Sequence, residues 1–159
     1  MTTLTLSPRD KAMLDGEHGA AAQMAMRILT TMAGVYGAIE LLNITAAHID
    51  GCLYHGYSGL EFAEKLVAGG AQVVVPTSLN VGAMDLIHPE HFQGTAQVAE
   101  WATRTMKAYE AMGCQPIYTC APYQTGYRPK FGEQIAWAES NAIVFANSVL
   151  GARTHRYGD

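Results

Sequence analysis

The sequence has few charged residues and no cluster of positive ones. Charged side chains make up 15% of the 159 residues, with 10 Lys and Arg against 14 Asp and Glu, and the net charge is -4. Binding to nucleic acid or to an anionic membrane surface depends on clustered Lys and Arg. The composition therefore argues against both partners, and no apolar run is long enough to span a bilayer.

Cysteine is also scarce. Cys52, Cys114 and Cys120 are an odd number of cysteines in no CxxC spacing, so the disulfide framework of a small secreted domain is not expected. The first residues lack the basic stretch and the apolar segment of a secretory signal peptide. These features predict a cytoplasmic protein with reduced thiols.

The composition suits a buried core, because 49% of the residues are hydrophobic. We expect one α/β domain over residues 1–159, since the length fits a single core and no repeat or low-complexity linker divides the chain. Apolar spacing and end signals predict a helix between Ser58 and Gly69 and further helices at 8–15, 20–33, 95–112 and 142–150.

Short apolar runs between these helices predict strands within 39–49 and at 72–75, 115–119 and 135–137. Strands that alternate with helices indicate a layered α/β domain, in which ligands bind at the loops beyond the carboxyl ends of the strands. Pro76 is expected to end its strand and to place Thr77, Ser78 and Asn80 in such a loop.

Several segments occur in the same order as in a known family. The chain closely resembles the catalytic part of aconitase X, a family of iron-sulfur dehydratases, at residues 14–19, 75–80, 118–123, 139–142 and 147–154. The resemblance runs from about Ser7 to Asp159. It implies a helix/sheet/helix fold of aconitase type, and that the chain is the N-terminal part of a larger catalytic subunit.

Cys120 follows a predicted strand, where a rigid loop can hold a thiolate ligand and leave a cluster open on one side. A lone cysteine is more often an inert buried thiol. The resemblance favours the metal role: Cys120 is implied to be a ligand of an iron-sulfur cluster completed by cysteines outside this chain. Cys52 and Cys114 are predicted to be structural.

Glu139, Ser140 and Asn141 precede an apolar helix. Free amides at a helix N-terminus attract a carboxylate or a phosphate, and the Ser and Asn side chains add donors, although a simple N-cap explains the same pattern. The resemblance implies a catalytic role for Ser140, with Glu139 as a candidate base, and substrate binding by Asn141.

Other candidate substrate ligands lie elsewhere in the chain. Arg153 has the bidentate geometry that suits a carboxylate, or it is a charge that complements the helix dipole, and Thr154 follows it. The resemblance implies substrate binding by both, by His55 in a glycine-flanked loop, and by the three polar residues after Pro76 that are named above.

The resemblance implies a hydro-lyase that removes water from a small hydroxy acid or amino acid. Bacterial members dehydrate cis-3-hydroxy-L-proline and archaeal members dehydrate 5-phosphomevalonate. The segment from Tyr127 to Glu133 is similar to the bacterial form and the chain lacks a phosphate cradle, so hydroxyproline is the preferred substrate.

Two other classes of protein stay open: a non-catalytic small-molecule binding module and an assembly subunit. The partners that the resemblance implies are the substrate, the remainder of the catalytic subunit and a small swivelling subunit or domain.

Overall fold

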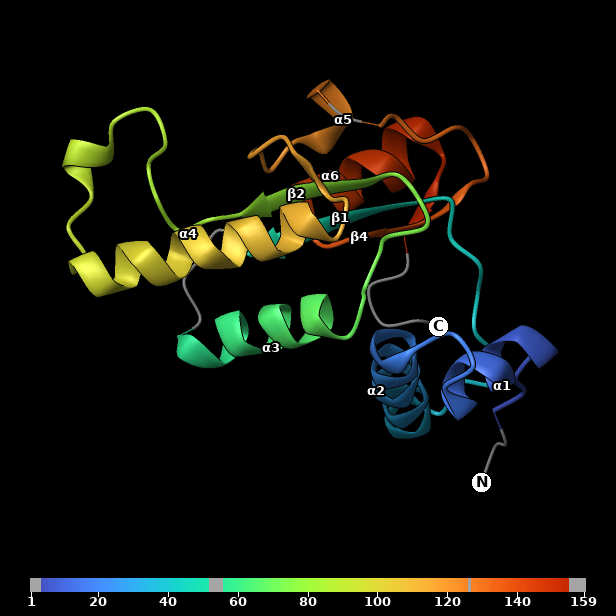
Figure 1. Ribbon diagram of the computed structural model, residues 1–159. Coiled ribbons are helices and arrows are strands. Elements are labelled where there is room, and N and C mark those ends of the chain that lie inside the picture. The colour runs from blue at the N-terminus through green and yellow to red at the C-terminus, as the bar shows by residue number, and fades with distance from the viewer. Residues whose placement is uncertain (1–3, 52–55, 126, 155–159) are drawn as a thin grey trace.

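Five parallel strands form one sheet in the order β3-β2-β1-β4-β5 (Figure 1). The structure, a computed structural model, describes residues 4–51, 56–125 and 127–154. The strands are β1 (Ala46–Gly51), β2 (Thr77–Val81), β3 (Gln115–Pro116), β4 (Gln134–Trp137) and β5 (Arg153–Thr154). The chain runs outward from β1 to β3 and then returns to the other side of β1, which creates a switch point between β1 and β4.

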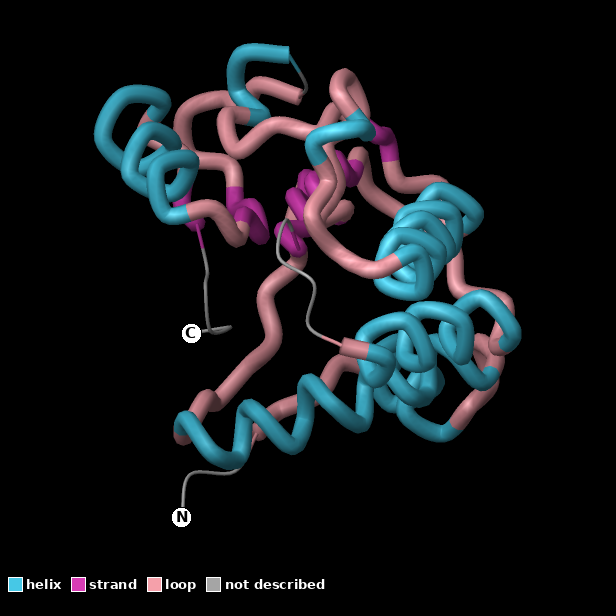
Figure 2. The backbone as a smooth tube through the Cα atoms, turned by 90° about the vertical axis from the view of Figure 1, so that its left-hand side faces the viewer, coloured by secondary structure: helices cyan, strands magenta, loops and turns pink. Residues whose placement is uncertain are grey.

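Helices lie on both sides of this sheet. They are α1 (Pro8–Asp15), α2 (Ala20–Tyr36), α3 (Tyr57–Ala68), α4 (Ala96–Ala111), α5 (Pro122–Thr125) and α6 (Ser140–Phe145), with a 3-10 turn at Pro89–His91 and a π-helical turn at Ala146–Leu150. Figures 1 and 2 show α6 on one side of the strands and α3 and α4 on the other. The predicted layered α/β architecture is confirmed. None of the helices in the described part of the chain is long and apolar enough to cross a membrane.

The two faces of the sheet are packed differently. On the α4 side, Leu79 and Cys114 are buried against Tyr109. On the α6 side, Ile135 and Trp137 are buried with small residues of the last helical segment, Ala142 and Ala146. Alanines at these positions let α6 lie close to the strands, so its first turn is held near the carboxyl end of β4.

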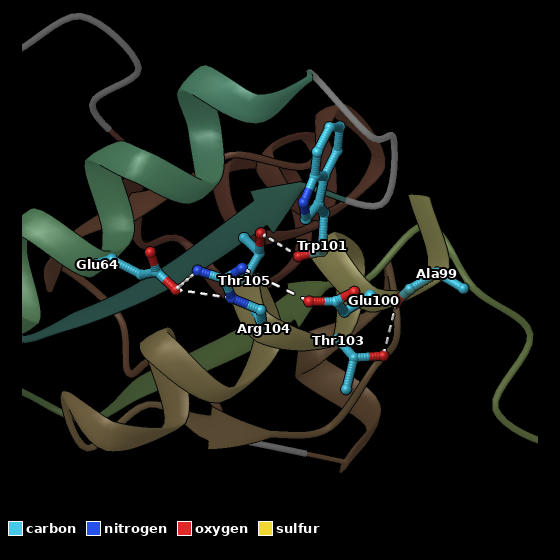
Figure 3. A network of polar contacts seen from close by, with 7 residues as sticks. All are labelled: Glu64, Ala99, Glu100, Trp101, Thr103, Arg104 and Thr105. Atoms are coloured by element: carbon cyan, nitrogen blue, oxygen red, sulfur yellow. Dashed lines mark hydrogen bonds and ion pairs between the residues drawn. The ribbon is translucent and has the colours of Figure 1, made fainter. Parts of the chain in front are cut away.

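The outer helices α3 and α4 are joined by exposed contacts (Figure 3). Arg104 donates from Nε and Nη2 to one oxygen of Glu64, at 3.0 and 2.7 Å, and its Nη1 lies 3.7 Å from Glu100. The rings of Tyr57 and Trp101 also meet, with centroids 5.2 Å apart. Exposed ion pairs of this kind contribute little to stability, so the ring contact is expected to contribute more than the ion pairs.

Local end signals gave correct helices in most places. Ser7 forms a capping box with Asp10 at the start of α1, and the Thr95 hydroxyl caps α4. The predicted stop of α2 near residue 33 was wrong, because the helix passes through Gly34 and ends where Gly37 turns left-handed at φ 68°. The helix expected between Ser58 and Gly69 begins at Tyr57, directly after Gly56.

The second strand is not where the apolar run predicts it. Val74 is 83% exposed, and the amide of Val73 bonds to the carbonyl of Met112 outside the sheet. Pairing with β1 begins one residue after Pro76, whose carbonyl accepts from Ala47. A proline has no amide hydrogen for the ladder and suits this position before a strand.

This shift corrects the placement of three candidate residues. Thr77, Ser78 and Asn80 belong to β2 itself and not to a loop beyond it. The predicted strand at 115–119 was also too long, since Tyr118 takes a left-handed conformation at φ 43° and leaves the sheet.

Candidate active site

Three segments meet at the carboxyl end of the sheet, and Asn80 joins them. Its side-chain nitrogen donates to Oε1 of Glu139 at 2.8 Å and to the sulfur of Cys120 at 3.2 Å. Asn80 is near the end of β2, Glu139 follows β4, and Cys120 follows β3. Because the strands are parallel, their carboxyl ends form one edge, the location at which open α/β sheets bind ligands.

Cys120 is exposed, whereas Asn80 and Glu139 are 7% and 9% exposed. The backbone around the thiol is also held, since the Asn141 side chain donates to the Cys120 carbonyl at 2.9 Å. The sulfur therefore lies at the surface of the site with a polar, buried pair beneath it.

Glu139 is the residue just before α6, and its side chain makes no cap for the helix. Its carboxylate instead accepts from Asn80, while the carbonyl of Glu139 accepts from Ile143 at 2.9 Å. Ser140 and Asn141 are exposed in the first turn and border an open hollow of about 510 Å³. Glu139, the candidate base, is 9% exposed and is not among the residues that line this hollow.

A histidine that sequence reasoning missed lies one step deeper in the sheet. His48, in β1, is 2% exposed, and its Nδ1 is 2.8 Å from the hydroxyl of Ser78. Its Nε2 is buried and bonds to no other described residue. Burial lowers the pKa of His48, and the carboxylates of Glu139 and Asp50 act in the opposite direction.

His48, Ser78 and Asn80 share one face of the sheet, because His48 is the register partner of Ser78 and Asp50 is the partner of Asn80. In the sequence, the polar residues His48 and Asp50 are two positions apart in an otherwise apolar segment. This spacing predicts that both side chains lie on one face of a strand. Thr77 points to the opposite face, where its hydroxyl donates to Val75 at 2.9 Å, so it does not join the group.

Two of the expected substrate ligands lie at the other edge of the sheet. Arg153 and Thr154 pair with Gln134 and Ile135, at the amino end of β4, whereas Glu139 follows its carboxyl end. The side chain of Asn147 donates to Thr154 at 2.8 Å and accepts from its amide at 3.1 Å. The last turn is thereby tied to the edge strand. His55 lies outside the described residues.

The side chains at this site can be compared with the ligands that an iron-sulfur cluster requires. Across residues 4–51, 56–125 and 127–154, no three His, Cys, Asp or Glu side chains gather as a metal site. Of the two cysteines in the described residues, Cys120 has the exposure of a cluster ligand, and an amide donates to its sulfur, a kind of contact that tunes cluster potentials; Cys52 lies outside the described residues. The described residues could therefore supply one ligand of a cluster, and a cluster would need further ligands from outside them.

Known proteins resemble the chain over almost its whole length. Residues 3–159 match the family described as aconitase X first domain. Cis-3-hydroxy-L-proline dehydratase of Hypocrea jecorina is 51% identical over 99% of this chain, and phosphomevalonate dehydratase large subunit of Methanothermobacter thermautotrophicus is 40% identical over 96%. The chain spans 26% and 39% of the lengths of these two proteins.

A solved structure agrees with this relationship. The crystal structure of aconitase X from Thermococcus kodakaraensis, in its holo form, superposes with a TM-score of 0.83 at 39% identity, over 98% of this chain and 38% of that one. The predicted fold of aconitase type is confirmed, and the chain belongs to the aconitase X family.

Proposed function

We propose that this chain forms part of a hydro-lyase that removes water from a small hydroxy acid, with cis-3-hydroxy-L-proline as substrate. The observation that carries the proposal is the meeting of Asn80, Cys120 and Glu139 at one edge of the sheet. The substrate is inferred from the relatives, since two cis-3-hydroxy-L-proline dehydratases, from Hypocrea jecorina and Pseudomonas aeruginosa, are each 51% identical to the chain.

Cys120 would hold one iron of the cluster, and the other cysteine ligands would come from outside this chain. When bound, such a cluster supplies a Lewis acid for the leaving hydroxyl. Asn80 orients the sulfur and the Glu139 carboxylate from a single amide group. Its two hydrogens serve two acceptors, so neither partner is free to rotate away from the site.

Glu139 is the base that we assign to the removal of the substrate proton. A carboxylate acts as a general base when it is held within reach of the proton that it takes, and the Asn80 bond and the end of β4 hold Glu139. Ser140 and Asn141 are assigned to the substrate carboxylate, because both are exposed on the same turn beside Cys120.

The other candidate substrate residues have different support. Ser78 acts through its contact with His48, since its hydroxyl is already bonded and buried. Substrate binding by His55, Thr77, Arg153 and Thr154 stays a prediction from the family resemblance. We also propose that the remainder of a catalytic subunit and a small subunit or domain complete the enzyme, as the term large subunit in the archaeal relatives indicates for those proteins.

The test is to measure iron and acid-labile sulfide in the full-length protein after anaerobic reconstitution. Cys120→Ala should lose the cluster, whereas Cys114→Ala should keep it, because Cys114 is buried in the core on the other face. Both purified forms are then given cis-3-hydroxy-L-proline and 5-phosphomevalonate. Turnover of the second compound alone would change the substrate assignment, and binding of a substrate without iron would favour a non-catalytic binding module.

A further inference from the structure

The chain reaches Cys120 through an unusual turn. Directly after β3, the amides of Ile117 and Tyr118 both donate to the carbonyl of Leu79, at 3.3 and 3.0 Å. Tyr118 has a φ of 43°, in the left-handed region that non-glycine residues seldom occupy. Such a conformation persists only where surrounding contacts hold it, so the contacts of Tyr118 are informative.

The side chain of Tyr118 supplies such a contact. Its hydroxyl donates to Oε1 of Glu110, in the last turn of α4, at 2.7 Å. The other oxygen of Glu110 accepts from Lys107, also at 2.7 Å. Both carboxylate oxygens are therefore engaged, and Glu110 presents a fixed acceptor to the phenol.

The turn and the sulfur contact depend on neighbouring residues of β2. Leu79 accepts the two amides of the turn, and Asn80, the next residue, donates to the Cys120 sulfur at 3.2 Å. Cys120 is two residues beyond Tyr118, so a rotation of the turn would move the sulfur relative to Asn80. The geometry thus links α4 to the thiol through Tyr118.

We propose that Tyr118 is a positioning residue, whose bond to Glu110 holds the left-handed turn and sets the Cys120 sulfur against Asn80. The purpose of this arrangement rests on the proposed function, in which Cys120 is a cluster ligand. The contact itself is a property of this chain without a cluster, so it can be tested whether or not a cluster binds.

The first measurement is the rate at which iodoacetamide alkylates Cys120 at one fixed pH, read by mass spectrometry of the peptides of the full-length protein without its cluster. Tyr118→Phe and Glu110→Gln each weaken the anchor. The Asn80 donor favours the thiolate, which is the form that reacts, so loss of this one net hydrogen bond should make alkylation slower by up to roughly fivefold in both variants. An unchanged rate in both variants would overturn the proposal.

Tyr127→Phe is the matched control. Tyr127 also bonds through its hydroxyl to a carboxylate, that of Glu133, at 2.8 and 2.9 Å, but this contact lies beyond α5. Its loss removes the same chemical group and should leave the Cys120 rate at the wild-type value. A slower rate in this variant as well would count against a specific role for Tyr118.

Cys114 reports on unfolding in the same experiment, because it is buried and burial raises the pKa of its thiol. Faster labelling of Cys114 together with Cys120 would overturn the proposal, since the bond would then support the whole fold. Coupling to Asn80 is the decisive readout. If Tyr118 acts through the Asn80 contact, Tyr118→Phe added to Asn80→Ala should give no further slowing, whereas independent effects of the two substitutions would multiply.

Discussion

The side chain of Asn80 donates to the carboxylate of Glu139 at 2.8 Å, and both residues are almost fully buried. They are 59 positions apart in the sequence and are brought together because β2 and β4 flank β1 in a parallel sheet. A buried carboxylate without a donor is unstable, so this bond supports the fold and the candidate site together.

Replacement of Asn80 should therefore affect stability in a way that depends on pH. Asn80→Ala leaves Glu139 without this donor, at a cost of about 1–3 kcal/mol in the free energy of unfolding. Asn80→Asp should cost more near neutral pH, because two carboxylates then face each other. Their repulsion raises the pKa of one of the two carboxyl groups in the folded state. The extra loss of stability in Asn80→Asp should therefore become smaller as the pH falls.

Urea unfolding of the wild type and the two variants at neutral and mildly acidic pH measures these differences. Asn43→Asp, at an exposed position outside the site, is the control for the added charge. Equal losses for Asn80→Ala and Asn80→Asp at both pH values would contradict the contact.

His48 should make the folded state less stable in mild acid. Its pKa is lowered from 6.5 chiefly by burial, so between that lower value and 6.5 the unfolded chain binds a proton that the native chain does not. This contribution to stability is fully present above pH 6.5 and is lost as the pH falls through the window.

The prediction is tested by comparing the free energy of unfolding at about pH 7.5 and about pH 5.5 in wild type and His48→Gln. The decrease between the two values should be smaller in the variant. His88→Gln changes an exposed histidine and should retain the wild-type decrease. A decrease of the same size in His48→Gln would show that His48 is not the group responsible.

Helices with local end signals could be predicted from the sequence. Ser7 followed by a proline, and Thr95 before a periodic apolar face, define α1 and α4 without reference to the rest of the chain. The position of β2 could not be predicted in this way. Apolar residues at 73–75 fit a strand, but pairing with Ala47 selects Thr77 and its successors.

In the candidate site, too, the sequence predicted some features, whereas others depend on tertiary pairing. The resemblance to a family identified Asn80, Cys120 and Glu139. Their mutual hydrogen bonds depend on the order of the parallel strands, which local sequence patterns do not reveal. His48 was missed because one histidine in an apolar segment is more often a core residue. Arg153 follows the last helix closely, yet the direction of β5 places it at the amino end of β4.

The core on the α6 side should respond strongly to loss of volume. Ile135 is completely buried in β4, and Ile135→Ala should lower the free energy of unfolding by about 2–5 kcal/mol, with about 0.5–1.5 kcal/mol for Ile135→Val. Val149→Ala is the control, because Val149 is 62% exposed and should change stability by less than about 0.5 kcal/mol. Chemical denaturation measures all three, and similar losses for Ile135→Ala and Val149→Ala would contradict the packing.

Substitution by alanine should change the free energy of unfolding in opposite directions at two glycines of the α2 region. Gly34 is inside the helix and Gly37 ends it, and an added Cβ would meet no atom within 4 Å at either position. Gly34→Ala should stabilise by about 0.5–1 kcal/mol, because alanine restricts the unfolded chain and favours the helix. Gly37→Ala should destabilise by about 1–2 kcal/mol, because φ is 68° there and an L side chain is strained. Thermal unfolding of the two variants gives both signs directly, and a stabilising Gly37→Ala would mean that α2 continues beyond Tyr36.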